Sequence, residues 1–133
     1  MPVISAVSGN VGLQAAAITV RALDTGNLKN ENRFAALKKE AITSLLMAII
    51  CGFLLGGIAI VWSHHVMLAV VIGVALAFSM LTAGLMGTVI PVVSKRFGFD
   101  PATTAGPFET AFQGIIGFVV FLGLATLMID WLV

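Results

Sequence analysis

Long apolar stretches without charged residues alternate with short polar segments along the chain. Four such stretches occupy residues 1–20, 41–62, 66–94 and 110–129. A helix crosses the roughly 30 Å hydrocarbon core of a bilayer with about 20 mostly apolar residues. We therefore predict an all-α integral membrane protein, a single transmembrane domain over residues 1–133 with four spans near residues 1–22, 41–62, 66–93 and 103–131. A transmembrane β-barrel is not indicated, because no segment alternates apolar and polar positions over the length of such a strand.

Composition narrows the class of protein further. The chain is 59% hydrophobic and 10% charged, whereas soluble domains carry about 25% charged residues. This excludes a soluble enzyme, and the net charge of +1 is too small for a nucleic-acid-binding face. A single cysteine excludes a disulfide scaffold or a zinc cluster. An intramembrane enzyme is not indicated either, because the spans contain no Ser–His, paired-Asp or HExxH arrangement.

The charged residues indicate how the spans are oriented. Nearly all of them fall in two loops, at residues 21–40 and 95–100, and every Lys and Arg lies there. Basic loops remain cytoplasmic, so we expect the loops at 23–40 and 94–101 to face the cytoplasm of a cell whose plasma membrane holds the protein. The turn at His64-His65 and the C-terminus then lie outside, with Trp62 and Trp131 at the outer interface.

This orientation makes the first span run inward from outside. Residues 1–20 lack the basic segment of a signal peptide. We expect that a further outward-running helix precedes Met1 in a longer parent protein. A short N-terminal tail outside the cell is the alternative.

The first span carries polar residues that lipid does not favour. Asn10 and Gln14 are four residues apart and share a helix face. Amides are costly in lipid without a partner, so this face points to protein or to a wet cavity. One interpretation is hydrogen bonding between helices. The other is a pore-lining face, with backbone carbonyls near Gly9 and Gly12 available to a cation.

Small residues in the second span indicate close packing. Gly52 and Gly56 form a GxxxG pair, which allows two helices to approach closely. Cys51 beside them is interpreted as a buried filler, since no charged residue lies nearby to activate its thiol. In the third span, Pro91 is expected to kink or end the helix. The two adjacent histidines are interpreted as an exposed turn rather than a metal site.

The last span combines a helix start with a helix breaker. Asp100 and Pro101 suit the N-cap and N1 positions. Pro107 cannot donate to the carbonyl of Thr103, so we expect the helix to break or bend there. Such breaks are tolerated where the backbone lines a cavity, and the freed carbonyls are ligands for hard cations.

Glu109 is the acidic residue placed inside a span, and Gln113 lies four residues further on the same face. An intramembrane carboxylate is a functional-site hypothesis by default. The alternative is an ion pair of Glu109 with Lys95 or Arg96 at the inner interface.

Two motifs resemble those of the MgtE-type magnesium channel family. The segment from Pro2 to Gln14, with Ser-Gly-Asn-Val-Gly-Leu-Gln at 8–14 and Val-Arg-Ala-Leu at 20–23, is similar to the family's GNxGxQ…VRAL signature. The segment Lys-Arg-Phe-Gly-Phe-Asp-Pro-Ala at 95–102, followed by Gly-Pro-Phe at 106–108, is similar to the entry to the family's last helix. Both occur in the family's order, and the resemblance covers essentially the whole chain.

The resemblance implies a homodimer whose cation pore runs between subunits. The family's membrane domain has five helices, and the four spans here would match its second to fifth, the second and fifth lining the pore. Asn10 would help to line the ion site, with backbone oxygens around Ala6 and Thr110. The family's cytoplasmic magnesium-sensing domains have no counterpart in the sequence.

The sequence departs from the family at the main cation-binding carboxylate. Alignment through Gly106-Pro107 and Gly117 places Gly114 where the family has an Asp. Glu109 is five residues earlier, about 7.5 Å along the axis and rotated by about 140°. Gly106 also stands where some members have a contributing Asn.

We expect a divalent cation channel or transporter, with Mg²⁺ as the transported ion. Asn10, Glu109, Gln113, Ala6 and Thr110 are the expected metal-site residues. The expected pore-lining residues are Gly9, Gln14, Gly106 and Gly114. Lipid, a second copy of the chain and divalent cations are the expected partners. The alternative is a non-transporting membrane subunit that keeps the fold but has lost the ion site, as Gly114 suggests.

Overall fold

The computed structural model describes residues 2–26 and 33–132, and this part of the chain is helical without strands. Its helices are α1 (Pro2–Asp24), α2 (Arg33–Ser63), α3 (Val66–Arg96), α4 (Pro101–Leu127) and the short α5 (Ile129–Leu132). The first four are long and apolar enough to cross a membrane, which confirms the predicted all-α class and the expected number of helices of spanning length in this part of the chain. Lys29 and Glu31 of the first predicted loop lie outside the described residues.

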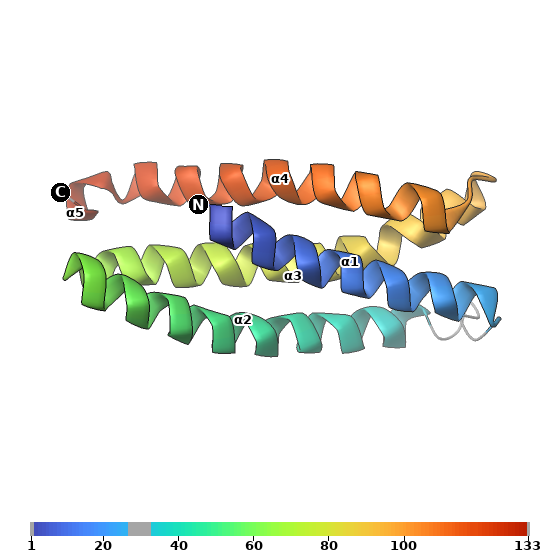
Figure 1. Ribbon diagram of the computed structural model, residues 1–133, viewed down its shortest axis with the longest axis horizontal. Coiled ribbons are helices and arrows are strands. Elements are labelled where there is room, and N and C mark those ends of the chain that lie inside the picture. The colour runs from blue at the N-terminus through green and yellow to red at the C-terminus, as the bar shows by residue number, and fades with distance from the viewer. Residues whose placement is uncertain (1, 27–32, 133) are drawn as a thin grey trace.

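Helix α3 is the centre of the bundle. Helices α1, α2 and α4 all pack against it, and α1 also packs against α4 (Figure 1). Ser8 contacts Ser79 near one end of α1, and Leu23 contacts Lys95 near the other. The residue numbers rise together, so α1 and α3 run parallel, with an offset of 71–72 residues.

Helix α4 runs antiparallel to α1. Gly12 faces Glu109, and Ser5 faces Gly117, so the residue numbers on α1 rise as those on α4 fall. This arrangement brings the N-terminal motif and the start of the last helix to the same side of α3.

The core consists of small and medium apolar side chains. Its buried members come from α1, α2 and α3, and they are Ile4, Val11, Ala48, Ala75, Leu76 and Met80. Many large apolar side chains of α2 and α4 point outward instead, such as Phe53 and Phe118. An apolar exterior around a core of small residues is expected for helices that pack within lipid.

The glycine pair of α2 packs as predicted. A Cβ on Gly52 would lie 3.8 Å from the Cα of Gly73, and one on Gly56 would lie 3.7 Å from the Cβ of Ala69. Both glycines therefore lie in the contact between α2 and α3, at distances that would also admit an alanine Cβ. Cys51 beside them is half-buried.

Two helix starts differ in how well the sequence predicted them. At α4, the Asp100 side chain accepts a hydrogen bond from the Ala102 amide at 3.1 Å and Pro101 follows it, so the predicted cap is confirmed. Helix α2 begins at Arg33, eight residues before the expected start at residue 41. Lys38, Lys39 and Glu40 are good helix formers, and they extend the helix beyond its apolar part.

The expected break at Pro107 is wrong, because α4 continues through it from Pro101 to Leu127. Pro107 lies in the second turn of the helix, so the missing amide deprives only the carbonyl of exposed Thr103 of its usual partner. Likewise α3 does not end at Pro91 but continues to Arg96. The predicted exposed turn is confirmed, since His64 and His65 are both exposed.

Candidate cation site

The residues predicted for an ion site lie on two different faces of the α1–α4 pair. One set lies on the open side of these helices and consists of Ala6, Gly9, Asn10, Gln14, Gly106, Thr110 and Gly114. The other set consists of Glu109 and Gln113, which point into the bundle. The structure therefore separates the amide and backbone groups of the open face from the intramembrane carboxylate.

On α1 the open face is a stripe of residues at helical spacing. Ala6, Asn10 and Gln14 follow one another every four residues, and all three are exposed. A Cβ on Gly9 would meet nothing within 4 Å, so the backbone there is open as well. The two carboxamides are thus available to a ligand outside the single chain.

On α4 the matching stripe consists of Gly106, Thr110 and Gly114, again every four residues. The Thr110 hydroxyl donates to the Gly106 carbonyl at 2.9 Å, and space around Gly114 is open to 4 Å. A Cβ on Gly106 would lie 4.0 Å from Cδ2 of Leu13. Gly106 on α4 therefore faces α1 at Leu13, the residue before Gln14.

A groove of about 460 Å³ runs between the two helices from Gly106 toward the end of α1. Arg21 and Asp24 line its far end together with Ala17. These three residues are not among those expected from the sequence to form the site. The spacing of the sequence could have identified them, because positions 17, 21 and 24 continue the helical stripe of positions 10 and 14 at spacings of three and four.

Glu109 and Gln113 occupy the interior between α1, α3 and α4. Their side chains are 0% and 1% exposed. A Cβ on Gly12 would overlap the Glu109 carboxylate oxygen Oε1, which fixes the direction of the side chain toward α1. The ion pair considered as an alternative is not formed among the described residues, since both carboxylate oxygens lack a partner and Lys95 instead donates to the Leu23 carbonyl at 3.3 Å.

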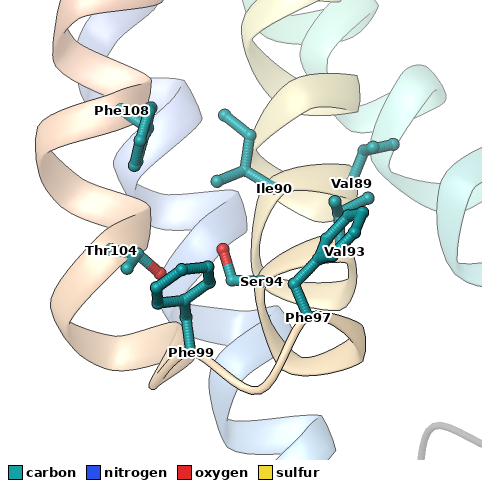
Figure 2. Close-up of a pocket in the computed structure, with 8 residues that line it drawn as sticks. All are labelled: Val89, Ile90, Val93, Ser94, Phe97, Phe99, Thr104 and Phe108. Atoms are coloured by element: carbon teal, nitrogen blue, oxygen red, sulfur yellow. The ribbon is translucent and has the colours of Figure 1, made fainter.

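A second cavity, of about 410 Å³, lies between the C-terminal part of α3 and the start of α4 (Figure 2). Phe97, Phe99 and Phe108 supply its aromatic lining, and Val89, Ile90 and Val93 supply aliphatic side chains. No carboxylate or carboxamide is among the described residues that line it. Its lining is mostly apolar, and the hydroxyls of Ser94 and Thr104 are its polar side chains.

Four membrane-spanning helices with an open polar stripe define a polytopic helical membrane protein. The family model MgtE, described as a divalent cation transporter, matches residues 1–124. The chain therefore belongs to the MgtE family, a family of transporters and not of enzymes. The resemblance seen in its two motifs is confirmed.

Three curated relatives, each named magnesium transporter MgtE, align with nearly the whole chain. The protein of Bacillus subtilis (strain 168) is 27% identical over 129 residues, which is 97% of this chain and 29% of the relative. Those of Enterococcus faecalis and Thermus thermophilus are 30% and 32% identical over 130 residues, which is 98% of this chain and 29% of each. The chain thus spans less than a third of the length of these relatives.

Proposed function

We propose that the chain is the membrane part of a divalent cation transporter and that Mg²⁺ passes along the open face of α1 and α4. The observation that carries this proposal is that Asn10 and Gln14 on α1 and Thr110 on α4 are polar side chains that a single chain leaves exposed. Membership of the MgtE family supports the choice of ion class, and the relatives' names support Mg²⁺.

A second copy of the chain is the proposed cover of this face. Carboxamides exposed to lipid are costly, and irregular polar surface at membrane depth is tolerated where protein or a water-filled cavity surrounds it. Two α1–α4 faces related by a two-fold axis would enclose a path in which Asn10 and Thr110 each occur twice. The pore would then lie on the dimer axis.

The groups on this face suit a hydrated ion. Mg²⁺ loses water reluctantly and usually keeps several water ligands. The Asn10 and Gln14 carboxamides and the backbone oxygens around Ala6 and Thr110 accept hydrogen bonds from that water. Because Gly114 replaces the family's carboxylate, we propose recognition through water more than direct ligation.

The proposed orientation follows from the basic loops. Residues 23–40 and 94–101 face the cytoplasm of the cell, and the C-terminus faces outward. Inward flux is then driven by the membrane potential, which contributes about 2.3 kcal/mol per charge per 100 mV.

Flux into liposomes that contain a Mg²⁺-sensitive dye tests the path. We expect Asn10→Ala to lower the initial rate at least tenfold. The matched control is Thr82→Ala on α3, whose hydroxyl donates to carbonyls of its own helix. Wild-type flux in Asn10→Ala would refute the proposed path.

Cross-linking tests the dimer separately. In a Cys51→Ala background, Gln14→Cys is expected to form a disulfide between two copies, and Phe53→Cys on the outward side of α2 is not. A Gln14→Cys protein that stays monomeric under oxidation would refute an interface at the α1–α4 face.

The second candidate is a membrane subunit that does not transport ions. Gly114, at the position of the family's carboxylate, favours it. Space around Gly114 is open to 4 Å, so Gly114→Asp fits sterically. Flux that is absent in the wild-type chain and appears in Gly114→Asp would support this second candidate over the first.

A further inference from the structure

A column of polar side chains runs through the interior of the bundle, on a different face from the open stripe. It consists of Ser8 on α1, Ser79 on α3, and Glu109 and Gln113 on α4, all fully or almost fully buried. These residues come from the three helices that pack on one another around this point. The column therefore belongs to a single chain and needs no second copy to complete it.

The packing register places the members of the column in neighbouring layers. A Cβ on Gly117 would lie 3.6 Å from the Ser79 hydroxyl oxygen, and Gly12 faces Glu109. Gln113 stands midway between Gly117 and Glu109 on the same face of α4, about 6 Å from each along the axis. Ser8 lies one turn before Gly12 and so reaches the level of Gln113.

The free atoms of this column are nearly all acceptors. Ser79 donates its proton to the Ser8 oxygen at 2.9 Å, and Ser8 donates its own to the Ile4 carbonyl at 2.7 Å. Both hydroxyls therefore present only lone pairs to the remaining space. No group of another helix in the described part of the chain hydrogen-bonds Glu109 or Gln113, and the Gln113 carboxamide, one turn along α4, is the polar neighbour of the Glu109 carboxylate.

No basic side chain of α1 or α3 lies close enough to compensate the carboxylate. Helix α1 carries no Lys or Arg before Arg21, nine residues or about 13 Å along the axis from Gly12. Helix α3 carries none before Lys95, eight residues from Gly87, which packs against the Gly12 carbonyl. A buried charge without a partner is strongly unfavourable.

We propose that the Glu109 carboxylate and the Gln113 carboxamide oxygen bind one monovalent cation of the size of Na⁺ inside each chain, apart from the open α1–α4 face. Oxygen ligands suit such a hard cation. One positive charge neutralises the single carboxylate. A cation can coordinate several of these oxygens at once, whereas a proton binds one oxygen and leaves the others without a partner.

Mg²⁺ suits this position poorly. It would leave one uncompensated positive charge in a low-dielectric interior, and it keeps several waters. The Glu109 carboxylate is packed against the backbone of Gly12, so a hydrated ion has little room. The inferred site thus differs from the proposed transport path in ion, in location and in the number of copies required.

Thermal unfolding of the purified full chain in detergent tests the site, with NaCl compared against choline chloride at equal ionic strength. Na⁺ at ten times its dissociation constant is expected to raise the folded-to-unfolded ratio about elevenfold, and choline is not. Glu109→Gln is expected to abolish the difference and Gln113→Leu to weaken it at least tenfold in affinity. The matched control is Asp130→Asn, an exposed acid at the end of the chain.

Equilibrium binding of radioactive Na⁺ to the wild-type chain keeps the test decisive if Glu109→Gln fails to fold. One ion per chain, displaced by NaCl and not by MgCl₂ or choline, supports the site. No binding, binding that Mg²⁺ displaces at equal concentration, or stabilisation that follows pH alone overturns it. Asn10→Ala should keep Na⁺ binding even where it loses Mg²⁺ flux, so failure of the site and failure of the transport path are distinguishable.

Discussion

Gly12 on α1 and Glu109 on α4 fit together so closely that the glutamate side chain occupies the space where a residue other than glycine would place its Cβ. That Cβ would overlap the carboxylate oxygen and lie 2.8 Å from Cγ of Glu109. The asparagine–glycine motif at the N-terminus therefore serves packing as well as the open polar face.

We predict that Gly12→Ala lowers the stability of the bundle by about 1–3 kcal/mol, the usual cost of overpacking. Unfolding of the purified protein by heat or by a denaturing detergent measures this. All three clashing atoms belong to the Glu109 side chain. In a Glu109→Ala background, Gly12→Ala should therefore cost much less stability than it does in the wild-type protein. Additive effects of the two substitutions would show that the close fit is not what restricts position 12.

Gly87 on α3 is restricted by the backbone of α1 and by the Cβ of Ala15, none of which can move as a long side chain can. A Cβ on Gly87 would overlap the Gly12 carbonyl oxygen and lie 2.8 Å from the Ala15 Cβ. Gly87→Ala should therefore destabilise the α1–α3 contact by at least about 1–3 kcal/mol, without rescue by truncation of Glu109. The control is Gly73→Ala on the same helix, where a Cβ meets nothing within 4 Å and thermal stability should be unchanged or slightly raised.

The hydrogen bond between Ser8 on α1 and Ser79 on α3 is expected to contribute less to the stability of the bundle. Ser79→Ala removes one buried interhelical hydrogen bond, and we expect a loss of about 0.6 kcal/mol, the average in membrane bundles. Ser8→Ala should cost at least as much, since Ser8 accepts that bond and also donates to Ile4. If Ser79→Ala proves more harmful than Ser8→Ala, the donor and acceptor roles assigned to the pair are wrong.

The N-cap of α4 is predicted to contribute measurably. Asp100→Ala removes the acceptor for the Ala102 amide and should cost about 1 kcal/mol, whereas Asp100→Asn should keep most of the cap. Hydrogen exchange of the first turn of α4 reports the loss locally. Equal exchange rates in all three proteins would contradict a capping role for Asp100.

Hydropathy predicted the fold because each span is a continuous apolar segment bounded by charged residues or a turn. For the same reason hydropathy places the start of α2 eight residues late, since Lys38 and Lys39 end the apolar stretch without ending the helix. The break at Pro107 was overestimated, because a proline in the second turn removes one hydrogen bond near the exposed end of α4.

The sequence does not indicate which face of α4 points into the bundle. Spacing places Glu109 and Gln113 on one side and Gly106, Thr110 and Gly114 on another. Helix α4 is apolar on nearly all sides, so no amphipathic stripe indicates which side meets α3. The close approach of Gly12 decides it, and this residue lies on another helix at the opposite end of the chain.

The contacts along α1 bear on how the bundle deforms. Ser8 accepts a hydrogen bond from Ser79, and the Leu23 carbonyl accepts one from the Lys95 ammonium group near the far end of the helix. Two attachments with nearly the same register oppose sliding of α1 along α3 and rotation of α1 about its own axis. The seam between these two helices and α4 contains the buried Glu109 and Gln113 and the open groove. No side-chain hydrogen bond between described residues joins α4 to α1 or α3, so we expect α4 to shift against these helices more easily than α1 shifts against α3.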